Sequence, residues 1–149
     1  METATSRRFG ALHRQRIVHL VRLLETRPPE KFIFADWFSE DWDIDKQVSC
    51  DTPACALGLA CLDPEFNKQG LTAKVYGDVL TPIHKMPGEQ TSGNEIAQSF
   101  FGVSKEDSFL IFFDVGYAVE ESNDVHPSWV ASKLKRLLRG IAPLPGEIM

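Results

Sequence analysis

The three cysteines of this chain lie close together, and they are the residues whose type and spacing could do chemistry. Cys50 and Cys55 stand on either side of Thr52 and Pro53, and Cys61 follows six residues later. A threonine side chain caps free helical amides, and proline suits the first helical position, so a helix is predicted to begin at Thr52-Pro53. Cys55 then takes the third helical position, where unpaired amides and the helix dipole stabilise a thiolate.

A thiolate at a helix start is typical of cysteine hydrolases and transferases, which also need a histidine base and a third group to orient it. For Cys55 the candidate base is His126, oriented by Asp114 or Asn123, and His84 is the other candidate base. No signature of a thiol-enzyme family surrounds these histidines. We therefore expect Cys55 to pack as a small apolar side chain, and the enzyme is the alternative.

Two further chemistries would use the same cysteines. Cys50, Cys55 and Cys61 with His84 would make a zinc-stabilised domain, but Cys55 and Cys61 on one helix would point about 240° apart. A redox pair between Cys50 and Cys55 is the other alternative. We expect neither a metal nor any other cofactor.

Composition and charge limit the class of protein. The chain has 149 residues, which predicts one globular domain over 9–140, with a disordered arm at 1–8 and a loose tail at 141–149. An odd cysteine count, no apolar start and no long apolar run predict a cytoplasmic protein away from membranes. The net charge of −5 argues against direct nucleic-acid binding, and the oligomeric state stays open.

The charges are unevenly placed along the sequence. Residues 32–65 carry eight Asp or Glu against one Lys, whereas residues 133–139 carry four Lys or Arg. Basic segments at 1–31 and 133–139 are expected to be solvated helix faces. Within the acidic part, an acidic aromatic stretch combines Trp37 and Trp42 with Asp41 and Asp43, as an interface anchor would.

Hydrophobic periodicity and turn residues predict about five helices around one core, with an appended β-hairpin; an α+β fold is the alternative. The helices are expected over 12–24, 54–62, 93–101, 105–113 and 127–139, and the hairpin over 71–83 with its turn at Gly77-Asp78. Gly58 costs its helix about 1 kcal/mol relative to Ala, which predicts a backbone packed against it. The helix that Ser104 caps is expected to bury Phe109, Leu110, Phe112 and Phe113.

The stretch from Cys50 to Ala60, CDTPACALGLA, resembles a pattern of small uncharacterised phage and bacterial proteins, C-G-T-x-x-C-x-x-G-x-A. Those proteins also have a helix that ends at a Gly-Leu/Val-Ser/Thr step, here Gly102 to Ser104, and a last helix opened by proline. The likeness covers about residues 30–140. Asp51 stands where the pattern has glycine, and a carboxylate there disfavours a thiolate at Cys50.

The resemblance implies a phage or mobile-element setting and brings no established activity. Together with the acidic aromatic stretch, it predicts a small accessory protein that binds a protein partner through Trp37, Asp41, Trp42 and Asp43. The motif residues Cys50, Thr52, Pro53 and Gly58 are then structural. A hydrolase or transferase that uses Cys55 is the first alternative, and a zinc-stabilised domain is the second.

Overall fold

The computed structural model describes residues 9–27, 32, 55–76, 79–85, 93–112, 116–117, 125–144 and 146. Its helices are α1 (Ala11–Thr26), α2 (Ala56–Leu62), α3 (Pro64–Lys68), α4 (Gly93–Phe101), α5 (Lys105–Phe112) and α6 (Pro127–Leu138), and its strands are β1 (Leu71–Tyr76) and β2 (Val79–His84). The predicted fold class, mainly α with an appended hairpin, is confirmed. Helix α3 is the unexpected element, because Asp63-Pro64 ends α2 and also caps and opens the next helix.

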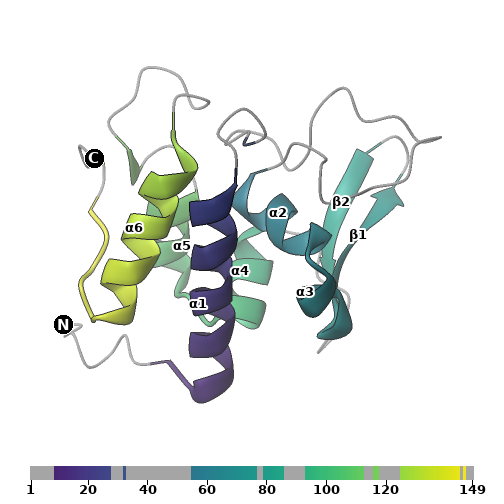
Figure 1. The fold of residues 1–149 in the computed structure, drawn as a ribbon, viewed down its shortest axis with the longest axis horizontal. Helices are drawn as coiled ribbons and strands as arrows, with labels where there is room; N and C mark the ends of the chain where they lie inside the picture. Colours follow the sequence, from purple (N-terminus) through teal and green to yellow (C-terminus); the bar gives the residue numbers. More distant parts are fainter. Residues whose placement is uncertain are drawn as a thin grey trace.

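Helix α1 stands at the centre of the fold. In Figure 1, α6 lies on one side of α1, and α2, α3 and the hairpin lie on the other. The predicted stripe of Ile17, Leu20, Val21 and Leu24 is buried along α1. This confirms the helical periodicity, since residues three and four apart share one face.

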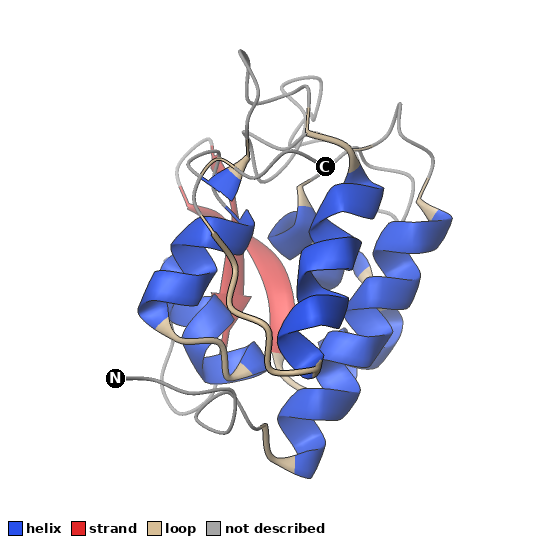
Figure 2. Ribbon diagram, turned by 90° about the vertical axis from the view of Figure 1, so that its left-hand side faces the viewer, coloured by secondary structure: helices blue, strands red, loops and turns tan. Residues whose placement is uncertain are grey.

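The hairpin forms as predicted and is one residue longer. Tyr76 pairs with Val79 and Leu71 pairs with His84, while the predicted turn residues Gly77-Asp78 lie outside the described residues. Strand β1 packs on α2 and α3, and β2 packs on α2 and α4. Figure 2 shows the two strands together, with helices making up the rest of the elements.

The joint between α4 and α5 has the backbone conformation that the sequence predicted, with Gly102 ending α4 and Ser104 capping α5. Gly102 has φ of +74°, and the N–H of Val103 donates to the carbonyl of Ala97 at 3.2 Å, which closes α4. A Cβ on Gly102 would lie 2.5 Å from Nδ1 of His13, so α1 packs closely on this turn. Ser104 then caps α5 by accepting from the N–H of Asp107 at 3.1 Å.

The prediction of which α5 residues are buried is partly wrong. Phe112 is buried, but Phe109 is 40% exposed and Leu110 is only half-buried, while Phe113 lies outside the described residues. The buried residues are Asp107, Ser108, Ile111 and Phe112. These positions recur every three to four residues, so Phe109 falls on the opposite face of the helix.

Of the two α1 arginines that reach other helices, Arg16 is half-buried and departs from the expected solvated basic face, whereas Arg14 is exposed as expected. Nη1 of Arg16 donates to the carbonyl of Phe100 at 2.9 Å, and its guanidinium lies 3.9 Å from the centre of the Phe100 ring. Burial lowers the pKa of Arg16 below its ordinary value. Arg14 reaches the carbonyl of Leu138 at 3.3 Å. Both side chains therefore bind the carbonyl ends of other helices, α4 and α6.

Lys133 of α6 is buried, although its segment was expected to face water. It is 1% exposed, and Nζ donates to the carbonyls of Leu110 at 2.9 Å, Leu144 at 3.4 Å and Gly116. The ammonium also lies 4.2 Å from the centre of the Tyr117 ring. This one charge joins the end of α5, the 116–117 segment and the chain beyond α6.

In the tail predicted from 141, residues 141–144 are only partly packed, since Ile141 is 45% exposed and Leu144 is 60% exposed. Gly140, with φ of +82°, ends α6 as predicted. The N–H of Ile141 donates to the carbonyl of Arg136 at 3.0 Å, and Pro143 is buried. The predicted arm at 1–8 lies outside the described residues. In the described part of the chain, every helix is too short or too polar to cross a membrane.

Replacing Lys133 with methionine is expected to lower the free energy of unfolding by about 3 kcal/mol, because buried carbonyls lose their donor. Lys135→Met is the matched control on the same helix, since this lysine is 51% exposed and only pairs with Glu25 at the surface. Its effect should stay within about 0.5 kcal/mol. Urea unfolding of both variants measures the difference, and equal effects would contradict the role given to Lys133.

Candidate functional site

The thiol of Cys55 caps a helix and does not occupy its third position. Helix α2 begins at Ala56, and Cys55 has extended backbone angles, with φ of −76° and ψ of −178°. Its sulfur accepts a hydrogen bond from the N–H of Gly58 at 3.5 Å. The predicted start at Thr52-Pro53 is therefore corrected by several residues, and Thr52, Pro53 and Cys50 lie outside the described residues.

Burial limits what the sulfur of Cys55 can do. The residue is 9% exposed and belongs to the core cluster, as the packed interpretation expected. A nucleophile must reach the carbonyl or other electrophile of a substrate, which requires an open approach to its sulfur. The arrangement is that of a helix cap built from cysteine, with Gly58 supplying the donor.

Cys61 lies deeper, at the other end of α2. It is 3% exposed, and burial raises the pKa of its thiol, as does the neighbouring Cys55 sulfur, while a hydrogen bond from the backbone of Ile83 opposes this shift. The protonated form is thus favoured in the folded chain. Both cysteines are free thiols.

The predicted base, His126, also serves as a helix cap. It is exposed at the start of α6, and Nδ1 accepts from the N–H of Ser128 at 3.3 Å and lies 2.8 Å from its hydroxyl. Helices α2 and α6 lie on opposite sides of α1 in Figure 1. Cys55 and His126 therefore begin two helices that α1 separates, and Asp114 and Asn123 lie outside the described residues.

His84, the other candidate base, is held inside the fold. It is 4% exposed, its Nδ1 lies 2.7 Å from the hydroxyl of Ser99, and its ring meets the Phe100 ring edge-on at 5.1 Å. Among the residues that the structure describes, no group of three or more His, Cys, Asp or Glu side chains is placed to hold a metal ion.

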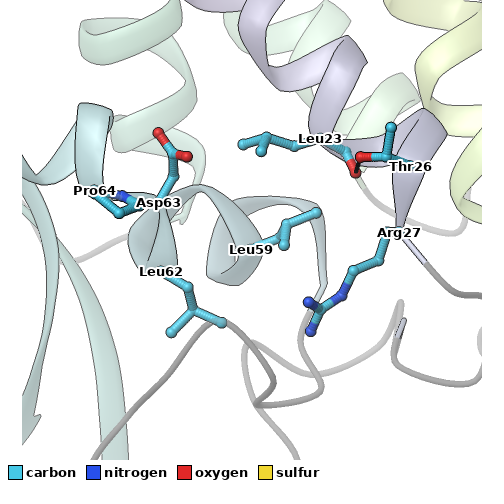
Figure 3. A pocket seen from close by; sticks show the side chains of 7 residues that line it. All are labelled: Leu23, Thr26, Arg27, Leu59, Leu62, Asp63 and Pro64. Atoms are coloured by element: carbon cyan, nitrogen blue, oxygen red, sulfur yellow. Dashed lines mark hydrogen bonds between the residues drawn. The ribbon is translucent and has the colours of Figure 1, made fainter.

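A cavity that the sequence did not reveal lies between the end of α1 and the junction of α2 with α3. Its volume is about 240 Å³. The lining residues are Leu23, Thr26, Arg27, Leu59, Leu62, Asp63 and Pro64, which we call the α1–α2 pocket (Figure 3). Leu23 and Leu59 come from facing helices, so the pocket forms only after tertiary packing.

Asp63 fixes one wall of the α1–α2 pocket. Its Oδ2 accepts from the N–H of Phe66 at 3.0 Å, which caps α3, and lies 2.8 Å from Nε2 of His19. The ring of His19 packs edge-on against Phe66 at 4.8 Å. One carboxylate thus ties α1 to α3 beside the pocket.

No protein-family model, curated protein or solved structure matches the chain. The function is accordingly inferred from the residues of the chain itself.

Both described thiols are expected to resist labelling in the folded state. In a Cys50→Ser variant at neutral pH, Ellman's reagent should react with Cys55 and Cys61 at least roughly 100-fold more slowly than in denaturant, because reaction requires opening of the core. Fast, selective labelling of Cys55 under native conditions would instead favour the cysteine hydrolase or transferase.

The buried thiol of Cys61 should make the free energy of unfolding fall at alkaline pH. Because its pKa is raised on folding from an ordinary 9.0, its contribution is fully present below pH 9.0 and is lost as pH rises above that value. Unfolding free energy measured from about pH 9 to 10.5 should fall more steeply in the unmodified chain than in Cys61→Ala, by up to about 1.4 kcal/mol per pH unit. Parallel curves for the two proteins would contradict this.

Proposed function

We propose that this chain is a small accessory protein that acts in the cytoplasm, in a phage or mobile-element setting, by binding a protein partner. The acidic aromatic stretch makes the contact, with Trp37 and Trp42 as anchors and Asp41 and Asp43 as flanking charges. The chain takes no part in direct nucleic-acid binding, because its overall charge is negative.

One observation carries the proposal. Residues 36–45 hold five carboxylates and two tryptophans, with no lysine or arginine among them. Tryptophan is enriched among the residues that contribute most to interface affinity, and charges of one sign speed association with an oppositely charged partner. The partner surface is therefore basic, with recesses for aromatic rings.

The use of charge in the described part of the chain supports this proposal. Arg16 and Lys133 are bound to backbone carbonyls inside the fold, so these two cations do not act as binding groups at the surface. Cys55 and His126 cap helices, which accounts for both residues without a reaction. Binding, and not catalysis, is the activity that these arrangements favour.

Two buried free thiols favour a reducing compartment. Disulfides dominate in oxidising compartments, whereas reduced cysteines persist in the cytoplasm. The cytoplasmic setting is part of the proposal.

The test is affinity capture with charge-matched variants. Tagged chain is crosslinked in cells that carry its gene, and the recovered partner is then titrated against the purified chain. Asp41→Asn with Asp43→Asn, and separately Trp42→Ala, should each weaken binding at least roughly tenfold, because each removes interface charge or a ring anchor.

Glu95→Gln with Glu106→Gln is the matched control, since both carboxylates are exposed on α4 and α5. This pair should change the dissociation constant less than about twofold. If the control weakens binding as much as the Asp41 and Asp43 pair, the interaction depends on net charge alone and the assigned surface is wrong.

A further inference from the structure

We draw no further inference here: the strongest candidate, the α1–α2 pocket between the end of α1 and the junction of α2 with α3, carries none, because nothing in the structure shows what fills it and its aspartate, Asp63, is already bound to His19 and to the N–H of Phe66.

Discussion

The fold depends on cationic side chains that bind the carbonyl ends of helices other than their own. A helix leaves its last carbonyls without partners and carries partial negative charge there. Arg16 of α1 binds the end of α4 and Lys133 of α6 binds the end of α5, while the exposed Arg14 of α1 reaches the end of α6 from the surface. Helices α4 and α5 have nine and eight residues, which is too short to be stable alone, so contacts between elements must hold them. Each cation therefore adds a directional electrostatic contact between two elements. Apolar packing alone is not directional and cannot fix how the elements are oriented.

The end of α5 shows how strictly such a bond constrains the sequence. The hydroxyl of Tyr117 donates to the carbonyl of Ile111 at 2.7 Å, beside the contact that Lys133 makes with Leu110. A Cβ on Gly116 would lie 1.8 Å from the carbonyl oxygen of Leu110, so only glycine allows this approach. Burying an ammonium costs several kcal/mol, and here carbonyl oxygens and the Tyr117 ring offset that cost.

Local patterns predicted the parts of the fold that depend on neighbouring residues. The stripe of α1, the pairing of the hairpin strands and the Gly102–Ser104 joint each follow from a few adjacent side chains, and the structure has all three. The start of α2 was misplaced because a capping side chain is recognised by type, and cysteine is not among the usual caps. The burial of Lys133 could have been predicted from the sequence. Lys133 lies three residues after Val130 and four before Leu137, on the apolar stripe of α6. What it could not show was the set of carbonyls that Lys133 meets, because they come from separate segments. The α1–α2 pocket was hidden for the same reason.

Burial and the pairing of backbone polar groups decide between a reactive and a structural role for the cysteine motif. Every residue of α2 is buried, and Cys55 before it is 9% exposed, so neither Cys55 nor Cys61 is openly presented to a substrate. A helix that is apolar all round belongs inside a domain, and its ends then need buried partners for their backbone groups. The sulfur of Cys55 meets the N–H of Gly58, and the amide of Asn67 donates to the carbonyl of Cys61 at 2.8 Å. Asn67 also donates to the carbonyl of Leu71 at 2.9 Å, which fixes the start of β1 against α2. The polar groups near this helix thus satisfy its backbone and position its neighbours.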